Sequence, residues 1–234
     1  MALPKLQQPL FDLTLPISGK KVKFRPFLVK EEKILLIGKD GGPKQQMTAI
    51  KQLLSEVIVE PKKFNPASLI LADMEYLFMK LRARSVQNIV TLKYRDKEDN
   101  EVYDFEVNLD EIEPTIDEDH VNVIDLDGNI GIELKEPTLG LIEKLDIKEG
   151  EEASRESVYK LLAGCIVKVY DSNEVYDDFT EKEAVEFIQN LDMNMFEKLK
   201  QFYDTLPKLT HTFEYTNKMG NSRKIKLQGL ADFF

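Results

Sequence analysis

The sequence has 234 residues, of which 42% are hydrophobic, so it can bury a core in one large domain or in two small ones. With 32% charged residues and only short apolar runs, it excludes a transmembrane helix, and its N-terminal residues lack the pattern of a secretory signal. One cysteine and two histidines exclude an internal disulfide and argue against a metal site, and the net charge is −10.

The first part of the chain predicts a hairpin, three helices and a second hairpin. Apolar and polar residues alternate on both sides of Ser18 and Gly19, which indicates two strands joined by a tight turn. Apolar residues at helical spacing then predict three helices, over residues 28–37, 44–59 and 65–85. Residues 88–109 predict the second hairpin, with its turn near 97–100, and the acidic residues 113–120 predict a linker.

The same order of elements begins again at residue 121. Residues 121–134 predict a hairpin, and residues 209–230 predict the last one. Apolar spacing between these hairpins indicates four helices, over residues 137–147, 154–170, 180–191 and 193–206. The third of these helices opens with a capping box, in which Thr180 is the N-cap and Glu183 lies three residues later.

Two pairs of segments in the two halves resemble each other. The matching segments are "VKFRPFLVKEEKI" with "IELKEPTLGLIEKL", and "TLKYRDKEDN" with "TFEYTNKMGN". We therefore predict an α+β fold in which β-hairpins flank helical layers, as an internal duplication of one hairpin–helices–hairpin unit. The predicted units are residues 1–112 and 121–234, joined by the linker 113–120. Chance similarity between hairpins is the alternative to a duplication.

Residues 121–134, "VNVIDLDGNIGIEL", allow two interpretations. The D-x-D-G stretch resembles the first motif of haloacid-dehalogenase-type phosphatases, in which Asp125 would attack phosphorus and Asp127 would act as acid and base. The companion residues of such an enzyme would be Asp177 and Asp178 for a metal and Lys160 or Lys168 for the phosphate. In the other interpretation, Asp127, Gly128 and Asn129 reverse the chain between two strands of a hairpin.

The residues after the aspartates favour the turn. Ile130, Ile132 and Leu134 continue with a period of two, as a returning hairpin strand does. A phosphatase of this type needs a buried parallel sheet, and no series of alternating strands and helices follows to build one. We therefore predict that the protein is not an enzyme, with the metal-dependent phosphatase as the alternative.

Positive and negative charges are separated along the chain. The net charge is +9 over residues 1–95, −17 over residues 96–152 and −2 over residues 153–234. We interpret these regions as surfaces that face each other or are solvated. The alternative is an acidic protein that binds a basic host partner through residues 96–152. The basic residues form neither a long helix nor aromatic-bearing strands, so we expect no binding to nucleic acid.

The sequence indicates no catalytic, cofactor-binding or metal-binding residues. His120 and His211 lie far apart in the sequence, and each is expected at the surface or at a cap. Cys165 lies on the apolar face of a predicted helix, where packing is the expected role of its thiol. We therefore expect a protein that works without a cofactor.

Three stretches resemble a known family. "GKKVKFRPFLVKEEKILLI", "MEYLFMKLRARSVQNIVTLKY" and the ending "FEYTNKMGNSRKIKLQGLADFF" are similar to baseplate hub proteins of T-even-type contractile-tailed bacteriophages. The likeness is carried by Arg25-Pro26-Phe27, Lys30-Glu31-Glu32-Lys33, Arg82, Arg84 and Ser85. Some relatives place a Cys-x-x-Cys pair in the last hairpin turn. This chain has Asn217 and Gly220 there, so no zinc-dependent role is implied.

The resemblance implies a non-enzymatic protein that acts by protein–protein binding. It would be a baseplate hub subunit of the virion, or a chaperone that assembles the hub in the host cytoplasm. Its partners would be other tail and baseplate hub proteins, and self-association into a homo-oligomer is a further expectation. The candidate partner-binding residues are Arg82, Arg84, Phe233 and Phe234. The alternatives are a helix-end role for the arginines and a tail that folds back onto the core for the phenylalanines.

Overall fold

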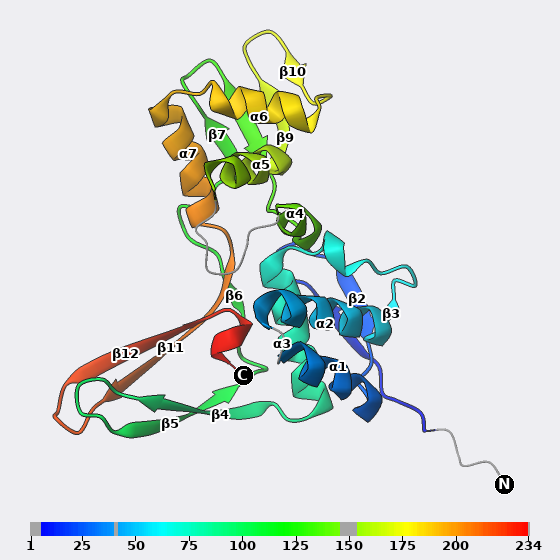
Figure 1. Cartoon of the computed structure of the whole chain (residues 1–234), viewed down its shortest axis with the longest axis vertical. Coiled ribbons are helices and arrows are strands. Elements are labelled where there is room, and N and C mark those ends of the chain that lie inside the picture. Colours follow the sequence, from blue (N-terminus) through cyan, green and yellow to red (C-terminus); the bar gives the residue numbers. More distant parts are fainter. Residues whose placement is uncertain (1–5, 40–41, 146–153, 234) are drawn as a thin grey trace. The chain divides into compact units, whose positions relative to one another are not determined.

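The computed structural model describes residues 6–39, 42–145 and 154–233. These residues form helices and antiparallel sheets, so the predicted α+β class is confirmed (Figure 1). The chain divides into two compact units. Unit 1 comprises Met1–Pro66, Ala72–Thr115 and Lys208–Phe234, and unit 2 comprises Ala67–Leu71 and Ile116–Pro207.

Unit 1 begins with a three-stranded sheet and three helices. Its first elements are β1 (Phe11–Thr14), β2 (Lys21–Phe24), α1 (Val29–Lys39), α2 (Gly42–Val57), β3 (Ile58–Glu60) and α3 (Leu71–Ser85). β1 and β2 form the predicted hairpin, and Gly19 in its turn has a φ of 67°. The helix predicted over residues 44–59 ends at Val57 instead, because the β-branched Ile58 pairs with Phe24 of β2.

Helix α3 is the central helix of unit 1. The sequence predicts one apolar stripe, formed by Leu77, Phe78 and Leu81, but the structure buries every residue from Ala72 to Leu81. A fully buried carboxylate is tolerated there because Asp73 accepts hydrogen bonds from the backbone N–H groups of Ile17 and Ser18, both at 3.0 Å. The start of α3 therefore holds the turn of the first hairpin in place.

Lys80 of α3 is also buried, with 7% of its surface exposed. Its ammonium group donates hydrogen bonds to the backbone carbonyls of Leu109, Asp110 and Ile112, at 3.1, 2.6 and 3.2 Å. Nζ also lies 4.7 Å from the centroid of the Tyr76 ring. Because an ammonium group has three protons, all of them are used, and they fasten the segment after β5 to α3.

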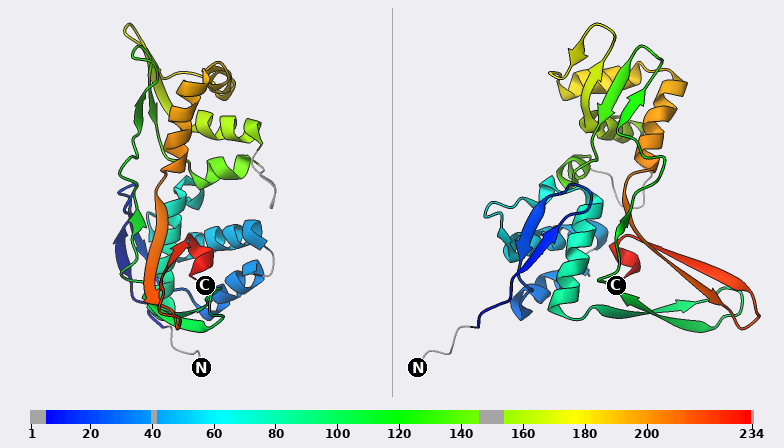
Figure 2. Two further views of the ribbon diagram at one scale, coloured as in Figure 1. Left: turned by 90° about the vertical axis from the view of Figure 1, so that its left-hand side faces the viewer. Right: turned by 180° about the vertical axis from the view of Figure 1, so that it is seen from behind.

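Two long hairpins of unit 1 lie side by side (Figures 1 and 2). Their strands are β4 (Ile89–Arg95) with β5 (Val102–Asn108), and β11 (Lys208–Thr216) with β12 (Ser222–Gln228). Both hairpins are as predicted, and β6 (Pro114–Thr115) pairs with the start of β11. Aromatic side chains fill the space between the hairpins, and the ring centroids of Phe105 and Phe213 are 4.8 Å apart.

Unit 2 has an antiparallel sheet in the order β10–β9–β8–β7, with helices on one of its faces (Figure 2). Its elements are β7 (Val123–Asp125), β8 (Gly131–Leu134), α4 (Leu139–Lys144), α5 (Arg155–Cys165), β9 (Ile166–Tyr170), β10 (Val175–Tyr176), α6 (Glu181–Gln189) and α7 (Met193–Asp204). The helix predicted over residues 154–170 ends at Cys165, because the β-branched residues that follow pair with β8. The capping box of Thr180 and Glu183 is confirmed.

The compact units differ from the units of residues 1–112 and 121–234 expected from the sequence. The last hairpin belongs to unit 1, although its sequence follows that of unit 2. Part of the linker expected over residues 113–120 forms β6. The internal duplication stays a prediction. The turns of the two matched hairpins differ in length. The Asp96 N–H donates a hydrogen bond to the Glu101 carbonyl in the first turn, and the Asn217 N–H donates to the Asn221 carbonyl in the second.

Candidate interaction site at the paired hairpin turns

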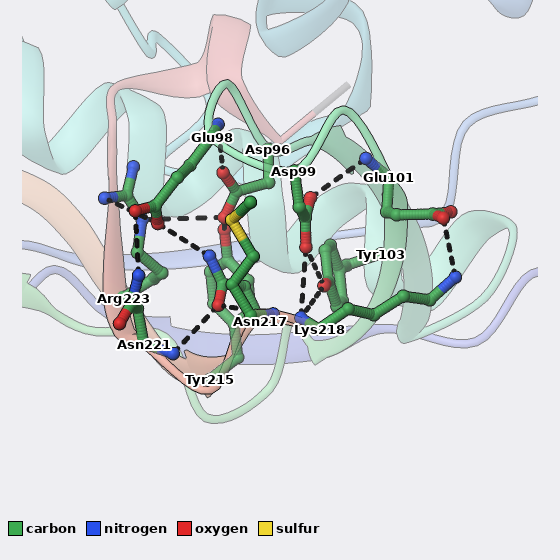
Figure 3. A network of polar contacts seen from close by, with 11 residues as sticks. Asp96, Glu98, Asp99, Glu101, Tyr103, Tyr215, Asn217, Lys218, Asn221 and Arg223 are labelled. Atoms are coloured by element: carbon green, nitrogen blue, oxygen red, sulfur yellow. Dashed lines mark hydrogen bonds and ion pairs between the residues drawn. The ribbon is translucent and has the colours of Figure 1, made fainter.

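The turns of the two long hairpins in unit 1 are joined by a network of polar contacts, which we call the hairpin clasp (Figure 3). The clasp consists of Asp96, Glu98, Asp99, Glu101 and Tyr103 of the first hairpin with Tyr215, Asn217, Lys218, Asn221 and Arg223 of the second. The residues that it joins are distant in the sequence, and Asp96 and Tyr215 are 119 positions apart. No local sequence pattern could therefore reveal it.

Asp96 is the fully buried centre of the hairpin clasp. Its carboxylate accepts hydrogen bonds from the Tyr215 hydroxyl and, at 2.7 Å, from the Glu98 N–H, while Arg223 Nε lies 3.5 Å away. The hydrogen bond from Tyr215, followed by the other contacts, lowers the pKa of Asp96. Burial, together with this hydrogen bond, raises the pKa of Tyr215 to about 12. Asp96 is therefore ionised and Tyr215 protonated at neutral pH.

The second turn supplies hydrogen-bond donors to the carboxylates of the first. Nδ2 of Asn217 and Nδ2 of Asn221 donate to Glu98 at 2.7 and 2.8 Å. The Lys218 N–H donates to Asp99 at 3.0 Å. Oδ1 of Asn217 also accepts hydrogen bonds within its own turn, including one of 2.9 Å from the Asn221 N–H. One asparagine side chain thus closes the second turn and binds the first.

The hairpin clasp fixes the two hairpin turns relative to each other. Its carboxylates accept hydrogen bonds or form ion pairs with amides, hydroxyls and cations of the same unit, so they fix the two turns to each other. Apolar side chains are exposed on the same two hairpins, at Ile89, Val102 and Met219. We therefore regard the paired hairpins as the candidate interaction site of unit 1.

Acid is expected to loosen the hairpin clasp. The hydrogen bond from Tyr215 lowers the pKa of Asp96. At Asp99, the effect of burial is outweighed by hydrogen bonds from several donors, which together lower the pKa. Both pKa values therefore lie below the ordinary aspartate value near 4. The stabilisation is therefore complete above that value and is lost as the pH falls through the lower, folded pKa. The chain has no tryptophan, so near-ultraviolet circular dichroism reports mainly its tyrosines and can follow the loss.

The Asp96→Asn variant is the control for this titration. The asparagine retains the shape of the side chain but cannot titrate, so the tyrosine signal should lose the part of its acid dependence that comes from Asp96, while the part from Asp99 remains. An equal acid transition in the variant and the wild type would show that protonation of Asp96 does not cause it.

The two candidate arginines have contacts inside unit 1. Arg82 is partly buried in α3, and burial lowers the pKa of its guanidinium group. Arg84 forms an ion pair of 3.1 Å with Asp110 and lies 5.6 Å from the centroid of the Phe11 ring. Part of the acidic region is thus bound by the basic region. Contact of Arg82 and Arg84 with a partner stays a prediction.

Phe233 folds back onto the core, which was one of its two expected roles. It follows the short helix η2 (Leu230–Asp232), is fully buried, and packs with residues of α3, β5 and β11. The Leu230 N–H donates to Oε1 of Glu75 at 3.3 Å, and burial raises the pKa of Glu75 to about 7. Phe234, the other candidate, lies outside the described residues.

The D-x-D-G stretch is a hairpin turn, as predicted. Oδ1 of Asp125 accepts a hydrogen bond of 2.6 Å from the Gly128 N–H, and Gly128 has a φ of 88°. Oδ1 of Asp127 accepts bonds of 2.9 and 2.8 Å from the N–H groups of Asn129 and Ile130, which lower the pKa of Asp127. The sheet is antiparallel, unlike the parallel sheet that the phosphatase motif requires.

Cys165 and His120, which were also considered for chemistry, have structural roles in the fold. Burial raises the pKa of the Cys165 thiol to about 12, so it is protonated at neutral pH. Nδ1 of His120 lies 3.0 Å from Oγ1 of Thr205 at the end of α7.

The described residues contain no group of three or more His, Cys, Asp or Glu side chains suited to a metal ion. Within the same ranges, no helix is long and apolar enough to cross a membrane.

Comparison with known proteins places the whole chain in one family. A family model described as "T4 bacteriophage base plate protein" matches residues 8–234, which include residues of both units. No curated protein and no solved structure matches the chain. Because the match extends over nearly the full sequence, the chain belongs to the T4 bacteriophage base plate protein family.

Proposed function

We propose that the protein acts in the baseplate hub, either as a hub subunit or as a factor that assembles the hub. Membership of the family gives the chain a structural role in a phage baseplate, among other baseplate proteins. The observation that carries the proposal is the family match over residues 8–234. The likeness of residues 19–37 and 74–94 to hub proteins supports the narrower assignment to the hub.

The proposed role is non-enzymatic. It is supported by the bonding of the carboxylates that the sequence offers for catalysis, because Asp125 and Asp127 are held by the N–H groups of their own turn. An assay with a generic phosphate ester and magnesium is expected to show no turnover. Activity that disappears in Asp125→Asn would contradict the proposal.

Mass spectrometry of purified virions separates the two proposed roles. A hub subunit is expected in the finished particle at a fixed ratio to other baseplate proteins. An assembly factor is expected to be absent from the particle, although baseplates do not form without it. Normal baseplates in phage that lack the protein would contradict both roles. Sedimentation of the purified protein tests the expected homo-oligomer.

A further inference from the structure

Unit 2 contains a pocket of about 450 Å³ between the β9–β10 hairpin and helix α6. This volume lies in the range of about 300 to 1,000 Å³ that is usual for sites receiving a ligand group. Its walls are mainly apolar and aromatic, and they include Ile166, Val169, Tyr170, Phe179 and Phe187. The pocket can therefore receive an elongated group with an apolar body.

The charged side chains that line the pocket are all acidic: Asp171, Asp178 and Glu183. Oδ1 of Asp171 accepts two backbone hydrogen bonds of 2.8 Å, and Glu183 is held by the capping box with Thr180. These two carboxylates are therefore fixed in position. Asp178 makes no hydrogen bond or ion pair with any residue that the structure describes, so its charge is available to a ligand.

Exposed apolar side chains lie on the strand beside the pocket. In β10, Val175 is 59% exposed, and Tyr176, which also lines the pocket, is 46% exposed. The Tyr176 hydroxyl lies 3.3 Å from Oδ2 of Asp171, which ties this aromatic wall to one of the fixed carboxylates. A partner that fills the pocket would also cover these side chains.

We propose that this pocket receives an arginine side chain presented by a partner protein of the baseplate. An arginine has an apolar stem that suits the walls and a planar guanidinium group that stacks on aromatic rings and binds carboxylates. Lysine fits less well because its ammonium group is compact and strongly hydrated. The identity of the partner rests on the proposed function, whereas the chemistry of the pocket does not.

Titration of the full ¹⁵N-labelled chain with N-acetyl-L-arginine amide, followed by NMR, tests the pocket. Saturable shifts are expected for the backbone amides of Val169, Tyr170, Tyr176 and Ala184. The citrulline analogue has nearly the same shape and no charge, so it is expected to bind at least about fivefold more weakly.

Two adjacent aspartates provide a matched pair of variants. Asp178→Asn removes the available carboxylate at the pocket and is expected to weaken binding by roughly threefold to tenfold. Asp177→Asn makes the same change one residue away, outside the pocket lining, and should leave binding within about twofold of wild type. Both residues are exposed, so both variants should fold. Tyr176→Ala removes an exposed aromatic wall and should also weaken binding.

Three results would overturn the pocket assignment. They are the absence of shifts at the pocket amides, equal binding of the citrulline analogue, and equal effects of the two aspartate variants. The proposed function is tested separately in virions and in phage that lack the protein. If the protein binds arginine but proves to have no role in the baseplate, the assignment of the pocket stands and only the assignment of its partner to the baseplate is wrong.

Discussion

Phe233→Ala is expected to lower the free energy of unfolding of unit 1 by about 3 to 5 kcal/mol, which is the usual effect of removing a buried aromatic ring. The ring is fully buried in a core formed by α3 and the two long hairpins. Its removal would leave a cavity that these elements cannot close without moving. Urea denaturation followed by tyrosine circular dichroism measures the change.

Met219→Ala is the control for this loss. Met219 lies in a turn of the same hairpin pair and is 64% exposed, so its truncation should change stability by less than about 0.5 kcal/mol. Equal denaturation midpoints for the two variants would contradict the burial of Phe233. If Phe233 instead anchored a partner, its variant would lose partner binding and retain its stability.

Lys80→Met is expected to lower the free energy of unfolding by about 2 to 4 kcal/mol, because buried carbonyls that lose their donor keep the cost of desolvation. Methionine retains an apolar stem of similar length, so the substitution mainly removes the ammonium group. Three carbonyls, of Leu109, Asp110 and Ile112, would lose their partner. The released segment should therefore become less ordered.

Hydrogen–deuterium exchange shows where Lys80→Met acts. Faster exchange is expected in the peptides that cover residues 109–112, with little change in unit 2. Lys182→Met removes an exposed ammonium group from α6 and is expected to change stability by less than about 0.5 kcal/mol. If the two lysine variants behave alike, the three hydrogen bonds of Lys80 do not stabilise unit 1.

Elements determined by neighbouring residues could be predicted from the sequence. The alternating residues around Gly19 and Gly128 and the capping box at Thr180 all have the predicted structure. Each of these signals depends on residues a few positions apart, whose preferences act within one turn or one helix end.

Pairing with distant strands explains the errors in helix ends. Val57 and Cys165 each end a helix earlier than expected, because the next residues add a strand to a sheet formed by other parts of the chain. Helical spacing continues into these apolar residues, so periodicity alone cannot show the boundary. Their β-branched side chains are the one local indication of a strand.

The hairpin clasp and the buried lysine could not be predicted for a similar reason. Asp96 and Glu98 look like ordinary solvated acids in the sequence, and their partners lie in a turn 119 positions away. Lys80 occupies a helix position where a lysine is usually exposed. The aromatic residues indicate only that each hairpin packs against another surface, and in the structure the rings of Phe105 and Phe213 stack on each other.

The insertion of unit 2 within the sequence of unit 1 has a consequence for biosynthesis. Residues 208–233, which complete unit 1, are translated after all of unit 2. Until residues 208–233 have been made, the aromatic face of β4 and β5 has no covering hairpin. Premature termination before residue 208 would therefore release a polypeptide in which the aromatic side chains of β4 and β5 are exposed, and such a polypeptide is prone to aggregation.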